Sequence, residues 1–220
     1  MRLVIACAQK WFELDQDIIN HNRLLFVKDE TELTFQRLNQ FKPDFIFFPH
    51  WNWIVQQEIF ENFKCIVFHT APLPYGRGGS PIQNLILDKF SEAPVCALKM
   101  TSDLDAGPVY AKQTVSLAGS LSQIFERINV VINSLIVQII KELPDPVPQV
   151  GRVHRYKRRT EQDNQIPAGI EIDEVYDRIR MLDDTSYPNA FLTVGDLKIK
   201  LFSASIDDGS VIAMCKIKKC

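Results

Sequence analysis

The apolar positions of this chain fall into short runs that alternate with amphipathic segments. The runs at 3–6 and 24–27 are apolar throughout, which is typical of strands buried on both faces of a parallel sheet. We expect further strands at 44–48, 65–68, 95–100 and 109–115, and helices at 31–41, 54–63 and from Ser120 to about 140. This alternation predicts an α/β fold, a Rossmann-like and mostly parallel sheet with helices on both faces.

The clearest helix signal begins at Ser120, where Gln123 completes the pattern of a capping box. An apolar stripe at helical spacing follows it, so we expect core packing against the sheet and a homodimer contact where the stripe extends past the sheet. Polar residues inside the segment, Glu126 and Asn133 among them, argue against a membrane span.

The prolines at 144, 146 and 148 predict a stiff linker between two domains. The expected division is a catalytic domain at 1–143, a linker at 144–151 and a small C-terminal α+β domain at 152–220. In this last part we expect a helix at 172–182 and strands at 190–194, 198–203 and 210–216.

Composition limits the partners and the compartment. The formal net charge of −2 gives no global attraction to nucleic acid or to an anionic membrane. The five cysteines contain no CxxC pair, so we interpret all of them as structural thiols of a cytoplasmic protein. The first residues do not read as a signal peptide, and no metal ligands are predicted.

Two loops carry candidate chemistry. In FHTAPLPYGRGGSP a strand ends at His69 and a Pro/Gly-rich loop follows, with Ser80 and Pro81 as the expected start of a helix. A second loop, SDLDAGP, follows the next apolar run and contains Asp105. We expect the imidazole and the carboxylate on neighbouring strand ends, at the carboxyl edge of the sheet, where they suit proton transfer in acyl chemistry. The first strand lacks a Gly-rich turn, which argues against a dinucleotide site.

These motifs resemble a known family. His69, the stretch with Leu73, Pro74, Arg77, Gly78, Pro81, Ile82 and Gln83, and the Asp105-Ala106-Gly107 triplet are similar to the formyltransferases that use formyl-tetrahydrofolate. The resemblance covers roughly residues 1–140, with a looser similarity at 172–205. It implies 10-formyltetrahydrofolate as the formyl donor, His69 as the proton-transferring residue and Asp105 as its orienting carboxylate.

One position departs from the family pattern. The family asparagine that donates a hydrogen bond to the formyl oxygen corresponds here to Val67, which has no donor. A substitute donor is needed for the developing oxyanion, and Asn52, after the 44–48 strand, is our candidate. A turn residue that bonds its own backbone is the equal alternative for Asn52.

The resemblance also implies the binding residues. The donor's pterin ring is expected against the 49–54 segment and the backbone after the 95–100 strand: Pro49, Trp51, Trp53, Ile54, Met100, Thr101, Ser102 and Asp103. The acceptor is expected at Thr70, Tyr75, Gly76, Arg77, Gly78 and Gly79, with Arg77 alternatively holding the loop. The basic residues of 152–159 are candidates for phosphate contacts, or a solvated face.

Three acceptors compete within this family. Net charge and the small tail argue against methionyl-tRNA, and the missing phosphate loop argues against glycinamide ribonucleotide. We therefore expect a nucleotide-linked amino-deoxy sugar as acceptor, and neither nucleic acid nor a membrane as partner. A methionyl-tRNA formyltransferase-like enzyme, or a folate-binding scaffold without turnover, remains the alternative.

Overall fold

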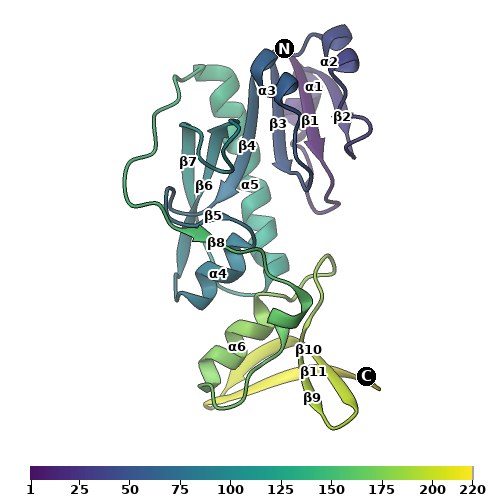
Figure 1. The fold of residues 1–220 in the computed structure, drawn as a ribbon, viewed down its shortest axis with the longest axis vertical. Helices are drawn as coiled ribbons and strands as arrows, with labels where there is room; N and C mark the ends of the chain where they lie inside the picture. Colours follow the sequence, from purple (N-terminus) through teal and green to yellow (C-terminus); the bar gives the residue numbers. More distant parts are fainter. Residues whose placement is uncertain (220) are drawn as a thin grey trace.

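A computed structural model describes residues 1–219. Its central sheet has the strand order β2-β1-β3-β4-β6-β7 (Figure 1). In that order the strands span Arg23–Val27, Arg2–Cys7, Phe45–His50, Cys65–Thr70, Glu92–Lys99 and Val109–Ser116. The first four are parallel to one another, whereas β6 is antiparallel to β4 and β7 to β6. The predicted Rossmann-like α/β class is confirmed.

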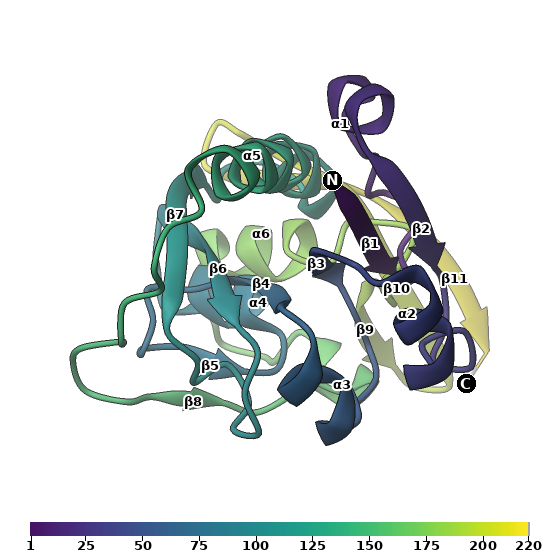
Figure 2. The ribbon, with the colours of Figure 1, turned by 90° about the horizontal axis from the view of Figure 1, so that it is seen from above.

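Helices cover the two faces of this sheet in two separate cores (Figure 2). One face packs against α1 (Gln16–His21), α4 (Pro81–Leu87) and α5 (Leu121–Glu142). The other packs against α2 (Phe35–Phe41) and α3 (Gln57–Asn62). Side chains of successive strand residues alternate between these cores, as in β3, where Phe47 belongs to the first and Phe48 to the second.

The helix α5 is the centre of the larger core. The predicted capping box is present, with Ser120 and Gln123 bonding each other's backbone. By length and composition α5 also qualifies as a membrane span, but half of that stretch is buried in the fold, as in a core helix. Its buried Asn133 donates to the Glu13 carbonyl and accepts from the Asp15 amide, which fixes the loop after β1.

Two helix starts and one helix cap differ from the sequence expectation. Helix α2 begins only at Phe35, because the Thr34 side chain caps it by accepting from the Arg37 amide. Helix α3 likewise begins at Gln57. Pro81 does open α4, but Ser80 has a φ of 51° and does not cap the helix, since its Oγ accepts from the Arg159 amide instead.

The C-terminal part contains a second, antiparallel sheet of order β11-β10-β9. A short 3₁₀ helix (Glu161–Asn164) and α6 (Ile172–Arg180) precede the strands β9 (Ala190–Val194), β10 (Leu197–Asp207) and β11 (Ser210–Lys219). Between the two sheets, β5 (Arg77–Gly78) pairs in parallel with β8 (Arg155–Tyr156). The tail therefore has the expected α+β composition.

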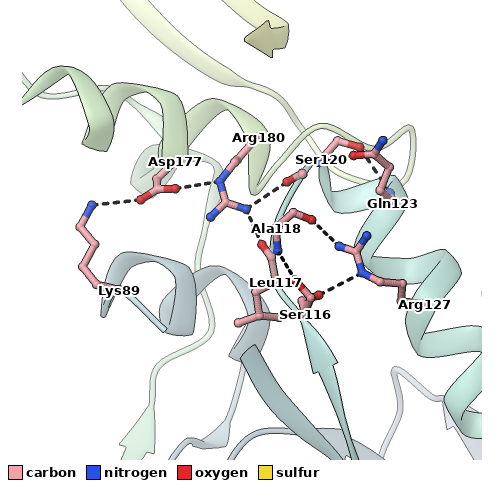
Figure 3. A network of polar contacts seen from close by, with 10 residues as sticks. Lys89, Ser116, Leu117, Ala118, Ser120, Gln123, Arg127, Asp177 and Arg180 are labelled. Atoms are coloured by element: carbon pink, nitrogen blue, oxygen red, sulfur yellow. Dashed lines mark hydrogen bonds and ion pairs between the residues drawn. The ribbon is translucent and has the colours of Figure 1, made fainter. Parts of the chain in front are cut away.

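A polar network joins α6 to the part of the chain that contains the central sheet (Figure 3). Arg180 donates to the Leu117 carbonyl at 2.5 Å and to the Gly119 carbonyl at 3.0 Å, in the turn that leads into α5. Asp177 accepts from Arg180 at 2.7 Å and from Lys89, after α4, at 3.0 Å. Arg180 and Asp177 together thus tie three segments to one another, and only 12% of the Arg180 side chain is exposed.

Replacing Arg180 with alanine is expected to destabilise the protein by about 2–3 kcal/mol, because the Leu117 and Gly119 carbonyls lose a charged donor. For a chain of this size that corresponds to a fall in melting temperature of roughly 5–10 °C, measurable by calorimetry. Arg178→Ala is the matched control, since among residues 1–219 Arg178 pairs with Glu174 alone, on the same helix, and should change stability by about 0.5 kcal/mol or less. Equal effects of the two variants would contradict this role for Arg180.

Candidate active site

His69 lies at the end of β4 on the face of the sheet that α2 and α3 cover. In β4, Ile66 and Phe68 face the α5 core, so His69 shares the opposite face with Cys65 and Val67. The ring is held on both sides: Nε2 lies 2.8 Å from the Gly76 carbonyl oxygen and Nδ1 lies 3.5 Å from Asp105 Oδ2. Because a carbonyl only accepts, Nε2 carries a hydrogen, and Nδ1 faces the carboxylate. Only 8% of each side chain is exposed.

Asp105 reaches His69 by a route that the sequence did not predict. Since β6 is antiparallel to β4, Lys99 pairs with Ile66, and the Met100 amide donates to the Cys65 carbonyl at the beginning of β4. Residues 100–108 therefore leave the sheet at the end remote from His69, and Asp105 then returns to it. The two residues meet as expected, but the expectation that they occupy neighbouring strand ends is wrong.

The position of Asp105 depends on close backbone packing. Asp105 has a φ of 54°, and its Oδ2 accepts from the Gly78 amide at 2.9 Å. A Cβ on Gly107 would lie 1.7 Å from the Lys99 carbonyl oxygen, and one on Gly78 would lie 2.4 Å from the Tyr156 carbonyl oxygen. Both positions therefore need glycine, because another segment of the protein approaches the backbone too closely there for a side chain.

The segment 147–159, which we call the strap, holds both loops. It leaves the region of β7, forms β8 beside β5 and continues to the tail (Figure 1). The His154 carbonyl accepts from the amides of Gly76 and Arg77, each at 3.1 Å. Gln149 donates to the carbonyls of Asp105 and Gly107, both at 2.8 Å, and accepts from Arg77.

Two residues that were predicted to contact the acceptor bind other residues of the protein instead. The Arg77 guanidinium donates to Gln149 Oε1 at 3.1 and 2.8 Å, which matches the loop-holding alternative. Tyr75 stacks on His154 with 4.4 Å between ring centroids, and its hydroxyl donates to Asp88. The roles of Thr70, Gly76 and Gly79 toward an acceptor stay predictions.

The residues expected around the pterin ring differ in exposure. Trp51, Val67 and Met100 pack partly buried against the α2–α3 core. The Trp51 ring contacts that of Trp53 edge-on at 4.9 Å, and Trp51 Nε1 is buried with no partner in the part of the chain that the structure describes. Ile54 is 97% exposed, and the neighbouring Asn52 side chain is exposed as well. Asn52 as oxyanion donor stays a prediction.

Comparisons with known proteins identify the family. A solved structure named methionyl-tRNA formyltransferase, from Clostridium thermocellum, is 33% identical over the whole of both chains, with a TM-score of 0.96. The chain belongs to the formyltransferase family. The family model described as "Methionyl-tRNA formyltransferase, C-terminal domain" matches residues 161–218 of this formyltransferase. Methionyl-tRNA formyltransferase of Gluconobacter oxydans is 31% identical over 144 residues, 64% of this chain and 47% of that protein. The chain spans about half the length of the first curated relatives that it matches.

These matches confirm the predicted enzyme class and correct the predicted acceptor. The relatives at 30–33% identity are named methionyl-tRNA formyltransferases. The structure of a likely sugar N-formyltransferase from Mycobacterium tuberculosis is only 14% identical, with a TM-score of 0.70 over 97% of this chain and 95% of that one, and shares the fold alone. The expected nucleotide-linked amino sugar is therefore wrong, as is the expectation that nucleic acid is not a partner.

Two of the cysteines of this formyltransferase, Cys65 and Cys96, are buried, as a structural role requires. Among the residues that the structure describes, Cys7, Cys65, Cys96 and Cys215 are free thiols, and Cys220 lies outside this range. Burial raises the pKa of Cys65 to about 12 and that of Cys96 to about 11. Such thiols are neutral and unreactive at physiological pH.

Sequence reasoning missed a second histidine, His50, at the end of β3. Its ring packs between aromatic neighbours, with 5.6 Å to the Trp11 centroid and 6.5 Å to that of Phe125. Burial, and then the charge of Arg158, lowers its pKa to about 4. The sequence signal was the PHW segment itself, in which Pro49 and Trp51 were given a role and His50 was not.

The low pKa of His50 makes a testable contribution to stability. The unfolded chain takes up a proton on His50 below about pH 6.5, whereas the folded protein takes it up only near pH 4. The free energy of unfolding is therefore not reduced by His50 above pH 6.5, and it decreases as the pH falls from 6.5 toward 4, because the unfolded chain binds the proton first. Relative to His50→Phe, the wild type should lose about 2 kcal/mol between pH 7.5 and pH 5, measured by urea unfolding. A wild-type-to-variant difference that is constant with pH would contradict this.

Proposed function

We propose that this protein transfers a formyl group from formyl-tetrahydrofolate to the amine of methionyl-tRNA. The observation that carries the proposal is the 33% identity, with the match covering the whole of both chains, to a protein named methionyl-tRNA formyltransferase. The His69–Asp105 pair supports the reaction type, and a basic face of the C-terminal sheet supports the acceptor.

The donor fits the residues near His69. A pterin is flat and largely apolar with polar edges, and Trp51, Trp53 and Met100 offer apolar walls. The buried and unpartnered Trp51 Nε1 is a donor without an acceptor, which a ligand oxygen or nitrogen satisfies. The exposed Ile54 and Leu104 are apolar surface that such a ligand would cover.

The two contacts of the His69 ring indicate which of its nitrogens transfers the proton. The acceptor amine attacks the formyl carbon, the resulting oxyanion collapses, and the bond from that carbon to the folate nitrogen breaks. The attacking amine loses a proton and the folate nitrogen gains one. Nε2 is fixed by Gly76, whereas the 3.5 Å contact of Nδ1 with Asp105 is longer than a hydrogen bond. We assign the proton transfer to Nδ1, with Asp105 stabilising the imidazolium.

The acceptor is supported by the register of the C-terminal sheet. Lys198 pairs with Lys218 and Lys200 with Lys216, so four lysines share one face. Like charges directly opposite each other are unfavourable without a counter-anion. Among the residues described, Glu161 pairs with Lys198 at 2.8 Å. The hydrogen bond from Lys198, then the charges of Lys198, Lys200 and Lys218, lower the pKa of Glu161.

This lysine face is continuous with the basic strap. Thr160, Glu161 and Gln162 line one shallow hollow together with Phe191 and Lys198. Arg155, Lys157 and Arg158 of the strap are exposed. Phe191 and Phe202 share the face with the lysines, and cations interleaved with aromatic rings suit a nucleic acid backbone.

The acceptor is tested by incubating the protein with labelled formyl-tetrahydrofolate and either methionyl-tRNA or a panel of amino-sugar nucleotides. We expect formyl-methionyl-tRNA as the product and a steep fall of kcat/KM with salt. Lys200→Gln and Lys216→Gln should each reduce the slope of log kcat/KM against log salt by about 1. A higher rate with any amino-sugar nucleotide than with methionyl-tRNA would overturn the proposal.

Lys42→Gln is the matched control for charge. Lys42 is exposed at the end of α2, which lies at the opposite end of the molecule from the C-terminal sheet (Figure 1). This variant removes the same charge and should leave the salt slope unchanged.

His69 and Asp105 are expected to act as one unit. His69→Ala and Asp105→Ala should each lower turnover by roughly a hundredfold or more, and the double variant should lose little beyond the worse single variant. Single-turnover rates with saturating donor measure this, with circular dichroism confirming the fold. Independent, multiplicative losses, or near-normal turnover of His69→Ala, would refute the assignment.

A further inference from the structure

The strap contains one side chain that turns inward from an otherwise exposed stretch. Pro148 and Val150 on either side are exposed, Val150 by 87%, whereas Gln149 is half-buried. Among the described residues its amide makes four hydrogen bonds, all with the two loops beside His69. It accepts two from Arg77 and donates one each to the carbonyls of Asp105 and Gly107. The partners lie at least 42 positions away along the chain.

The chemistry of these partners selects glutamine. A guanidinium only donates and a carbonyl only accepts, so the group between them needs an acceptor on one side and donors on the other. An amide satisfies both, and Arg77 fixes its orientation by taking Oε1, which leaves the Nε2 hydrogens for the loop. Glutamate offers acceptors on both sides, and leucine offers neither.

We propose that Gln149 is a positioning residue that sets the distance between Asp105 and His69. Asp105 belongs to an irregular loop, and its carboxylate is placed by the Gly78 amide and the nearby His69 ring. The backbone of the same residue is placed by Gln149 Nε2, which also holds Gly107 two residues further on. Releasing these carbonyls lets the carboxylate move away from His69, although Gln149 itself contacts neither reacting atom.

The inference deepens the proposed function, because it rests on His69 and Asp105 as the reacting pair. The variant Gln149→Glu tests the donor role of the amide apart from its acceptor role, because glutamate keeps the oxygen and loses the Nε2 hydrogens. The variant keeps an acceptor for Arg77, so we expect the melting temperature to fall by only a few degrees. It sets a carboxylate against two carbonyls, so kcat should fall roughly a hundredfold, as expected when a catalytic group is displaced by about 1 Å. KM for the acceptor should stay unchanged. In an Asp105→Asn background, Gln149→Glu should cause little further loss of kcat.

A second readout needs no turnover. The ring ¹⁵N resonances of His69 report on the Asp105 contact, so Gln149→Glu should shift them in the same direction as Asp105→Asn. Gln138→Glu is the matched control, because Gln138 is an exposed glutamine on α5 whose amide bonds Glu142. That variant should leave both kcat and the His69 resonances unchanged.

The outcomes separate the inference from the proposed function. Unchanged His69 resonances and unchanged kcat in Gln149→Glu overturn the positioning role, whatever the acceptor is. Shifted resonances in a protein that formylates no methionyl-tRNA uphold the positioning role and reject the proposed function. If Gln149→Glu does not fold, Gln149→Asn, which keeps the amide but shortens it, is subjected to the same two measurements.

Discussion

The site depends on the two contacts that hold the His69 ring. The Gly76 carbonyl and the Asp105 carboxylate approach opposite nitrogens of one imidazole, and both belong to loops without regular structure. Neither Gly76 nor Asp105 lies in a helix or strand that satisfies its backbone polar groups, so the shape of each loop depends on the hydrogen bonds that other segments supply. In this fold the strap supplies those bonds: the main chain of His154 holds the Gly76 loop, and the side chain of Gln149 holds the Asp105 loop.

The glycines of the two motifs follow from the same constraint. At Gly78 and Gly79 the nearest atoms to an added Cβ belong to the strap, the Tyr156 carbonyl and Arg158. At Gly107 the nearest atom is the Lys99 carbonyl of the preceding strand. The motifs are therefore patterns of close packing between protein segments, and Asp105 comes near His69 because these segments approach so closely.

This explains which features were predictable from the sequence. Apolar runs identified the strands and α5, because burial on both sheet faces leaves a local pattern of side chains. The order of the two loop motifs identified His69 and Asp105. Nothing local marks Gln149, which lies between exposed residues of a proline-rich stretch and takes its meaning from partners distant in sequence. The antiparallel direction of β6 was hidden for the same reason, since an apolar run does not encode strand polarity.

Net charge misled the prediction of the acceptor, because it averages over a surface on which position matters. The chain is net acidic by two charges, yet β10 and β11 each place lysines at alternate positions, and their antiparallel register brings these lysines to one face. Alternate spacing was visible in the sequence, but the register that pairs the lysines was not. The strap connects this face to the site, since Gln149 contacts the Asp105 loop and Thr160, directly after the strap, lines the hollow beside Lys198. The proposed acceptor, with its phosphates on the lysine face, would lie beside the residue that follows the strap, so the proposal connects acceptor binding with the stretch of backbone that positions His69 and Asp105.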